Sequence, residues 1–161
     1  MINLLRKIKR KYFDKGYHFK LFFKDNKNDA KLLDYELNSE SIFFELGGYK
    51  GDYSEKIISK FGSNLYIFEP DSKYYNILAE RFMGNDKVKI LNYAVSNKNK
   101  DLNLNRNGES STIGHNKKGK GTKVKGTLLS DFIKNNNIDK IDLVNMNIEG
   151  SEYVVLRDLN N

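Results

Sequence analysis

The chain has 161 residues, and its 28 lysines and arginines outnumber its 21 aspartates and glutamates to give a formal net charge of +7. This length predicts one domain of ordinary size with a single core. The absence of cysteine excludes disulfides, thiolate zinc sites, iron–sulfur clusters and a cysteine nucleophile. No apolar run reaches the roughly 18 residues of a membrane span, and no secretory signal is readable, so we expect a cytoplasmic protein.

The first 40 residues are predicted to form a basic helical segment. Among residues 1–24, eight lysines and arginines accompany a single acid, Asp14. Leu4, Leu5, Ile8 and Tyr12 recur at helical spacing, which predicts a basic amphipathic helix over 2–14. Two interpretations stay open: this helix packs on its own domain with a solvated basic face, or it makes peripheral contact with an anionic membrane surface.

From residue 41 to residue 161, short apolar runs alternate with helical patterns, which is typical of successive β-α units. We predict strands over 41–46, 65–68, 88–92 and 141–146, and helices over 52–61, 71–83, from Thr127 or Ser130 onward, and 151–159. Residues 97–126 are predicted to be irregular or edge-like. Right-handed crossovers between the strands then give an α/β fold with a mostly parallel sheet and helices on both faces.

Polar residues and glycines mark the ends of the predicted helices. Asp52 lies near the start of the first helix and Gly62 ends it, while Asp71 caps the second. The inner face of the second helix is expected to consist of Tyr75, Leu78, Ala79 and Phe82.

A glycine-rich turn follows the first predicted strand, with the sequence Glu-Leu-Gly-Gly-Tyr-Lys-Gly over residues 45–51. Glycine at such a turn adopts conformations that other residues avoid and lets a ligand approach the main chain. The start of the following helix exposes free N–H groups and the positive end of its dipole. Nucleotide-binding turns have this organisation, although tight packing alone also requires such glycines.

An acid, Glu69, ends the second predicted strand, where a carboxylate can accept hydrogen bonds from ribose hydroxyls. Together with the turn it favours a ribose-bearing cofactor, without separating NAD from S-adenosylmethionine. A pyrophosphate usually takes a G-x-G-x-x-G loop. Here Gly47 and Gly51 lie four positions apart behind Glu45, an arrangement that suits a cofactor with an ammonium group and no pyrophosphate, such as S-adenosylmethionine.

Six segments in order resemble the FkbM-type S-adenosylmethionine-dependent methyltransferases. Residues 44–54 resemble the family's motif I, D-x-G-A-N-x-G, residues 68–70 match F-E-P, and residues 93–96 contain A-V-S. Residues 109–112 resemble a serine cluster, 127–132 resemble T-L-D-x-F, and 147–152 resemble D-x-E-G-x-E. The series covers about residues 41–158. The resemblance implies a Rossmann-like class I methyltransferase sheet that is short at its C-terminal end, with S-adenosylmethionine as cofactor and no metal.

The resemblance also implies roles for single residues. Glu45 and Gly47 would line the methionine end of the cofactor, Gly51 would close the turn, and Glu69 would take the ribose hydroxyls. The full set of implied cofactor-binding residues is Glu45, Gly47, Gly48, Gly51, Glu69, Ala94 and Ser111, with Ala94 near the adenine or the exit of the third strand and Ser111 in a loop that shields the cofactor.

The candidate catalytic residues are Asn147 and Glu149, which the resemblance implies, and His115, which follows the serine cluster. Asn147 and Glu149, with Glu152, would form the mouth where the acceptor meets the methyl group. His115 would act as a base toward an acceptor hydroxyl, unless it is simply a solvated loop histidine.

Two positions depart from the family pattern. Tyr49 stands where the family has asparagine, so we expect Gly48 to take over the positive φ of the turn. Asn147 stands where the family has aspartate, and an amide cannot act as a base.

The resulting prediction is an O-methyltransferase acting by in-line displacement on a sugar hydroxyl of a glycan or on a secondary metabolite. One alternative, favoured by Asn147 and the short sheet, is a catalytically weak or partner-dependent S-adenosylmethionine-binding module. A nucleic-acid methyltransferase is less favoured and is motivated by the net charge and the lysine-rich residues 117–125. An uncovered sheet edge would invite a second copy of the chain or another partner.

Overall fold

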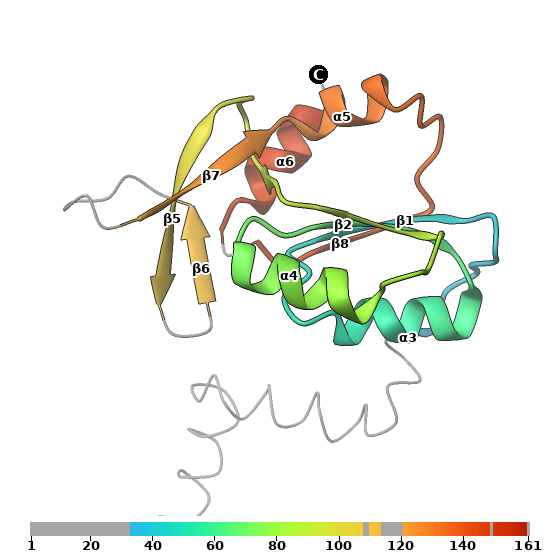
Figure 1. Ribbon diagram of the computed structural model, residues 1–161. Coiled ribbons are helices and arrows are strands. Elements are labelled where there is room, and N and C mark those ends of the chain that lie inside the picture. Colours follow the sequence, from blue (N-terminus) through green and yellow to red (C-terminus); the bar gives the residue numbers. More distant parts are fainter. Residues whose placement is uncertain (1–32, 108–109, 114–120, 149, 161) are drawn as a thin grey trace, which may run out of the picture. The chain divides into compact units, whose positions relative to one another are not determined.

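The computed structural model describes residues 33–107, 110–113, 121–148 and 150–160 (Figure 1). The described residues from Leu37 onward belong to one compact unit. The predicted basic helix over 2–14 lies outside the described residues. No helix within the described ranges is long and apolar enough to cross a membrane.

The main sheet contains four parallel strands. They are β1 (Ile42–Leu46), β2 (Asn64–Phe68), β3 (Val88–Leu91) and β8 (Leu143–Met146), and their order is β3-β2-β1-β8. The chain proceeds outward from β1 to β3 and later returns to the other side of β1. The strand order therefore reverses beside β1, and open α/β sheets bind their ligands at such a switch point.

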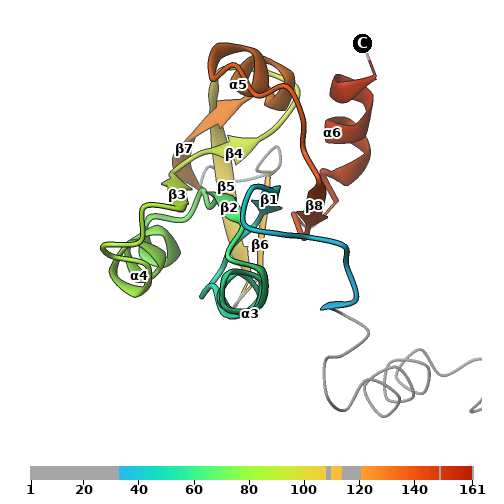
Figure 2. The same ribbon diagram turned by 90° about the vertical axis from the view of Figure 1, so that its right-hand side faces the viewer.

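Helices cover both faces of this sheet (Figures 1 and 2). α3 (Asp52–Phe61) and α4 (Ser72–Arg81) lie on one face, and α5 (Leu129–Asn135) and α6 (Glu152–Leu159) lie on the other. This arrangement confirms the predicted α/β, Rossmann-like fold class.

Alternate residues of β1 build the two sides of the core. Phe44 and Leu46 are fully buried among side chains that include Leu129 of α5 and Val155 of α6. Phe43 instead packs edge-on against Tyr53 of α3, with 6.0 Å between ring centroids. Apart from Glu45, both faces of β1 are therefore apolar, which explains why a run of apolar residues identified this strand.

The predicted helix ends are confirmed. Gly62 ends α3 with φ 64°, and Oδ1 of Asp71 accepts a hydrogen bond from the main-chain N–H of Lys73 at 2.9 Å. The predicted inner face of α4 was wrong at one position, because Tyr74 is buried and Tyr75 is only half-buried. The ring of Tyr74 packs against a residue of the glycine-rich turn, described below, which the helical pattern alone does not reveal.

A second sheet occupies much of the region predicted to be irregular. Its strands are β4 (Ala94–Val95), β5 (Asp101–Asn107), β6 (Ser110–Ile113) and β7 (Thr122–Thr127), in the order β4-β7-β5-β6. β4 and β7 are parallel, and the other pairs are antiparallel. Leu104 and Val124 form a small separate core with Ala94. Residues 97–126 were predicted to be irregular or edge-like, and irregular structure was wrong for the three strands β5, β6 and β7.

Candidate functional site

The carboxyl ends of β1, β2 and β8 meet at one edge of the main sheet. Leu46 pairs in register with Phe68 on one side and with Met146 on the other. The residues that follow these strands are Gly47, Glu69 and Asn147, so the sheet brings together three positions that the sequence assigned to the site. We call this edge the acidic rim, defined by Glu45, Gly47, Glu69 and Asn147.

Gly47 is required where β1 leaves the sheet beside β8. Its φ is 90°, in the region that favours glycine. A Cβ atom at this position would lie 2.4 Å from the main-chain oxygen of Asn147. The N–H of Gly47 donates to the oxygen of Phe68 at 2.8 Å, and the N–H of Asn147 donates to the oxygen of Leu46 at 2.9 Å. The first glycine of the motif therefore lets the ends of β1 and β8 approach each other.

The other two glycines of the turn lie against α4. A Cβ at Gly48 would meet Ile67 of β2 at 2.3 Å and Leu78 of α4 at 3.0 Å, and one at Gly51 would meet Leu78 at 2.8 Å and Phe82 at 2.9 Å. Gly51 also has φ 83° and directly precedes α3. The packing of β2 and α4 accounts for both glycines by itself, and their predicted contact with a cofactor stays a prediction.

Tyr49 itself adopts the left-handed conformation of the turn, with φ 49°, so the expectation that Gly48 would do so was wrong. This conformation costs a non-glycine residue about 1–2 kcal/mol. Two contacts offset the cost. The ring of Tyr49 packs on that of Tyr74, with 4.5 Å between centroids, and its main-chain N–H donates to Glu69.

Glu69 is buried at the end of β2, with 6% of its surface exposed. Its Oε2 accepts a hydrogen bond from the N–H of Tyr49 and its Oε1 one from the N–H of Asp71, both at 2.9 Å. Burial raises the pKa of Glu69, the two N–H groups oppose this rise, and the nearby Asp71 carboxylate adds to it. The acid thus links the glycine-rich turn to the start of α4.

Glu45 is also buried, with 4% of its surface exposed, and its side chain lies on the α3 side of β1. It accepts a hydrogen bond from the hydroxyl of Ser54, a fully buried residue of α3. Burial raises the pKa of Glu45 to about 7; hydrogen bonds from Ser54 and Asn145 oppose the rise, and the charge of Glu69 contributes to it. The sequence analysis identified Glu45 as a site residue but missed its hydrogen-bond partners Ser54 and Asn145. In the sequence, Asn145 differs from its surroundings only in being polar between apolar neighbours.

The two acids give the rim a negative character. The groups that shift the pKa of Glu45 are Ser54, Asn145 and Glu69, none of which is a cation. Burying a carboxylate is costly unless hydrogen bonds and an opposite charge compensate it. A ligand with a positively charged group would supply the missing charge, so the described part of the rim suits a cationic ligand.

The opposite side of the rim is formed by the turn between β8 and α6. Both carboxylate oxygens of Glu152 bind main-chain N–H groups of this turn, Oε1 that of Ile148 at 3.1 Å and Oε2 that of Gly150 at 2.9 Å. Glu152 therefore holds the turn in shape. Asn147 is exposed beside it, and its predicted role toward an acceptor stays a prediction.

The remaining predicted site residues lie elsewhere or outside the description. His115 and Glu149 lie outside the described residues. Ser111 belongs to β6, where it pairs in register with Arg106 of β5. Ala94 is buried in the core of the second sheet, with 1% of its surface exposed. Their predicted roles stay predictions.

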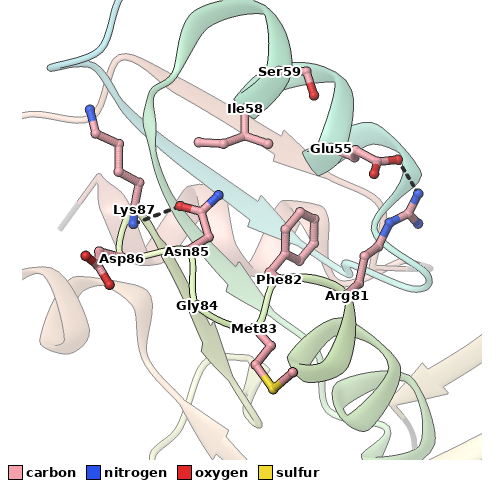
Figure 3. Close-up of a pocket in the computed structure, with 10 residues that line it drawn as sticks. All are labelled: Glu55, Ile58, Ser59, Arg81, Phe82, Met83, Gly84, Asn85, Asp86 and Lys87. Atoms are coloured by element: carbon pink, nitrogen blue, oxygen red, sulfur yellow. Dashed lines mark hydrogen bonds and ion pairs between the residues drawn. The ribbon is translucent and has the colours of Figure 1, made fainter.

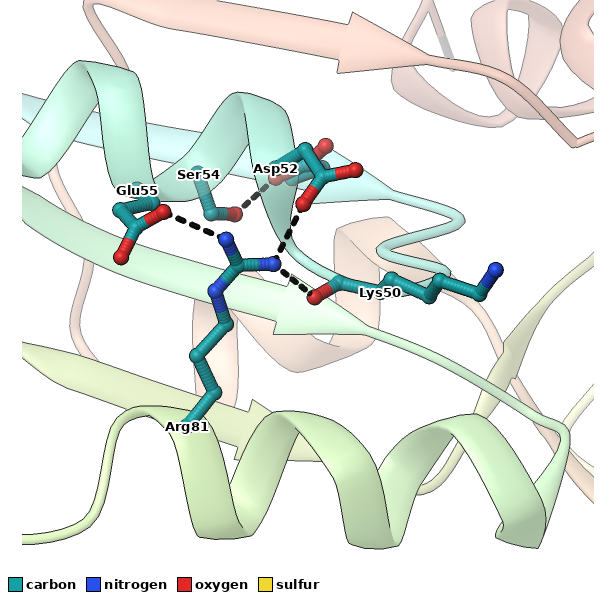
Figure 4. A network of polar contacts seen from close by, with 6 residues as sticks. Lys50, Asp52, Ser54, Glu55 and Arg81 are labelled. Atoms are coloured by element: carbon teal, nitrogen blue, oxygen red, sulfur yellow. Dashed lines mark hydrogen bonds and ion pairs between the residues drawn. The ribbon is translucent and has the colours of Figure 1, made fainter.

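An arginine that sequence reasoning missed fastens the turn to α4 (Figure 4). The guanidinium of Arg81 donates to the main-chain oxygen of Lys50 and forms ion pairs with Asp52, at 2.6 Å, and with Glu55. These acids raise the pKa of Arg81. Its contacts join the end of α4 to the first turn of α3, directly after the glycines.

A hollow of about 660 Å³ lies beside this arginine, between α3 and residues 81–87 (Figure 3). Its apolar lining consists of Ile58, Phe82 and Met83, and Glu55 and Arg81 stand at one side. The described residues that line it include none of the predicted site residues. This hollow is therefore separate from the acidic rim.

Comparison with known proteins adds two findings. Residues 45–161 match the model of the family described as Methyltransferase FkbM domain. A probable ribosomal RNA small subunit methyltransferase A from Methanococcoides burtonii (strain DSM 6242 / NBRC 107633 / OCM 468 / ACE-M) is 31% identical over 90 residues. This match covers 55% of the chain and 33% of the relative, so the chain spans about a third of the length of that curated relative.

Proposed function

Because the chain belongs to the FkbM methyltransferase domain family, we propose that it binds S-adenosylmethionine at the acidic rim and transfers its methyl group to an oxygen acceptor. The observation that carries this proposal is the presence of two buried acids, Glu45 and Glu69, at the switch point of a parallel sheet.

The residues of the rim fit this cofactor. A carboxylate offers about four lone-pair positions, and Glu69 uses two of them for main-chain N–H groups, which leaves capacity for ribose hydroxyls. The negative character of Glu45 and Glu69 complements the ammonium and sulfonium groups of the cofactor. We therefore assign the methionine end to the Glu45 side of the rim and the ribose to Glu69.

When bound, S-adenosylmethionine supplies an activated methyl group on a good leaving group. The contribution of the chain is then alignment and the exclusion of water, which supply much of the rate in such a displacement. Glu152 holds the main chain at Ile148 and Gly150, so that Asn147 can offer its amide to an acceptor hydroxyl. As an amide, Asn147 would orient this hydroxyl without removing its proton, which would pass to water as the carbon–oxygen bond forms and the carbon–sulfur bond breaks.

For the acceptor, we propose a sugar hydroxyl of a glycan or a hydroxyl of a secondary metabolite, which the family resemblance supports. RNA is the second candidate, because the relative from Methanococcoides burtonii is a probable ribosomal RNA methyltransferase. A binding module that needs a partner for turnover is the third, since Asn147 replaces the aspartate of the family pattern. Membrane contact by residues 1–40, a partner at a sheet edge and a cytoplasmic location stay predictions.

Calorimetric titration of the full chain with S-adenosylhomocysteine tests cofactor binding independently of activity. Glu69→Ala should weaken binding by roughly 1–3 kcal/mol, the usual cost of leaving buried polar partners unpaired. Glu80→Ala, which changes an exposed acid on α4, is the matched control and should bind as the parent does. Equal affinities for all three chains would contradict ribose binding at Glu69.

Transfer of a radiolabelled methyl group then distinguishes the acceptors. Label in a base-stable, nuclease-resistant glycan fraction supports the sugar acceptor, and label in nuclease-sensitive RNA supports the second candidate. Cofactor binding without transfer to either pool supports the binding module. Competition by increasing salt serves as a control for the RNA arm, because phosphate contacts weaken steeply with salt.

A further inference from the structure

We propose that the buried acid pair Glu45 and Glu69 makes the rim selective for the cationic sulfonium cofactor over its neutral thioether product, and that Glu45 releases its proton to solvent when the cation binds. This inference rests on the proposed function, because it takes S-adenosylmethionine as the ligand. It goes further in assigning the pair a part in discriminating substrate from product.

The geometry places both acids at one turn. Glu45 pairs in register with Ile67, two positions before Glu69 on the neighbouring strand. In the turn that follows β1, the main-chain N–H of Tyr49 donates a hydrogen bond to Glu69. The two residues are 4% and 6% exposed, so the protein itself covers both acids almost completely.

Each element packed around Glu45 contributes a neutral or acidic group. α3 contributes the hydroxyl of Ser54, β8 the amide of Asn145 and β2 the carboxylate of Glu69. Asp71, at the start of α4, adds a further acid beside Glu69. The guanidinium of Arg81 is directed to Asp52, Glu55 and the Lys50 carbonyl (Figure 4).

These surroundings respond differently to the two ligands. Both ligands carry the ammonium group, but S-adenosylmethionine carries in addition a positive charge on sulfur, and a nearby cation stabilises a carboxylate against protonation. Because burial raises the pKa of Glu45 to about 7, this acid holds a proton for part of the time near neutrality. The additional positive charge of the sulfonium then favours loss of this proton, whereas S-adenosylhomocysteine, with the ammonium group alone, favours it less. After methyl transfer, S-adenosylhomocysteine lacks the attraction between the sulfonium and the two carboxylates, and this loss favours its release.

Titration of the full chain with both ligands between about pH 5.5 and pH 8 tests the inference. Below the pKa of Glu45, the dissociation constant of S-adenosylmethionine should rise by up to about tenfold for each unit of pH lowered, by proton linkage. The slope for S-adenosylhomocysteine should be clearly shallower. Near pH 6.5, the enthalpy measured for S-adenosylmethionine should differ between two buffers of different ionisation enthalpy, because a proton is released.

Two variants separate charge from structure. Glu45→Gln keeps the shape and an oxygen for the Ser54 hydroxyl but removes the titration, so it should flatten the pH dependence and reduce the preference for the sulfonium several-fold. Ser54→Ala keeps the acid but removes a hydrogen bond that lowers its pKa, so the midpoint of the pH dependence should move to higher pH. Asp139→Asn, at an exposed acid between α5 and β8, should behave as the parent chain does.

The outcomes distinguish the inference from the proposed function. Binding of S-adenosylmethionine with the same affinity at every pH, or an unchanged preference in a folded Glu45→Gln variant, would overturn the inference and leave the proposed function standing. If neither ligand binds at any pH to a chain that circular dichroism shows to be folded, the proposed function fails and the inference fails with it.

Discussion

The main-chain oxygen of Asn147 lies 2.4 Å from the position that a Cβ atom would take at Gly47. The first glycine of the motif and the first residue of the acceptor-side turn are therefore in direct main-chain proximity. The two motifs lie about a hundred positions apart in the chain, and this packing brings them to the same edge of the sheet.

Gly47→Ala should destabilise the chain by about 2–5 kcal/mol, because the new methyl adds an overpacking cost to the cost of a positive φ. Gly84→Ala is the matched control: φ there is +78°, and a Cβ would meet no atom within 4 Å. It should cost only about 1–2 kcal/mol. Urea unfolding of both variants measures the difference. Equal losses of unfolding free energy would show that the end of β8 shifts away from the new methyl group without cost.

Local pattern predicted the main sheet well for a physical reason. Strands buried on both faces are continuous apolar runs, so the predicted strands 41–46 and 65–68 differ from β1 and β2 by one residue at their starts. The second sheet escaped prediction because its strands are largely polar. β7 has one buried side chain, Val124, and its pairing with Leu102 of β5 joins residues that are distant in sequence.

In the candidate site, too, some residues could be predicted from local sequence pattern and others could not. Glu45 and Glu69 could be predicted, because an acid at the end of an apolar strand is a local signal. Their surroundings could not: the hydroxyl of Ser54 reaches Glu45 only because α3 packs under β1, and Arg81 reaches the turn only because α4 ends beside α3. Tertiary packing, which no local pattern encodes, sets the pKa of the acids and the shape of the turn.

Glu45→Gln should change how stability depends on pH. The pKa of Glu45 rises from an ordinary 4.5 to about 7 on folding, so the folded chain binds the extra proton between these values. The contribution of this proton to stability is fully present below pH 4.5 and is lost as the pH rises to about 7. The variant lacks this loss. Its stability relative to the parent should therefore increase by roughly 3 kcal/mol between pH 4.5 and 8.

Chemical unfolding at several pH values measures this difference directly. Comparing the two chains at each pH cancels the titration of all other groups that they share. Parallel stability curves for the parent and the variant would show that the pKa of Glu45 is the same in the folded and the unfolded chain.

Arg81→Lys tests whether the turn needs the planar guanidinium. A lysine keeps the charge but cannot reach the Lys50 oxygen, Asp52 and Glu55 together. Since both acids are more than half exposed, we expect a loss of at most about 1 kcal/mol, and a smaller loss at high salt. Binding of S-adenosylhomocysteine should weaken in addition, because the carbonyl contact positions the turn. Unchanged binding in a destabilised variant would restrict Arg81 to a structural role.

The last prediction concerns the two helices on the opposite face of the sheet. Asp158 of α6 accepts hydrogen bonds from the main-chain N–H of Ser130, at 3.0 Å, and from its hydroxyl, at 2.7 Å, at the start of α5. A carboxylate at a helix N-terminus satisfies an N–H group without an intrahelical partner and interacts favourably with the helix dipole. Asp158→Ala should therefore cost about 1–2 kcal/mol of unfolding free energy.

Asp139→Ala changes an exposed acid near the other end of α5 and should cost less than about 0.5 kcal/mol. A double-mutant cycle with Ser130→Ala isolates the hydroxyl contact, and a non-zero coupling energy is expected because the two residues touch. Since α6 also carries Glu152, which holds the 147–150 turn, the Asp158→Ala chain should bind an acceptor less well at unchanged cofactor affinity. Loss of cofactor affinity in the same proportion would instead mean that α6 supports the whole rim.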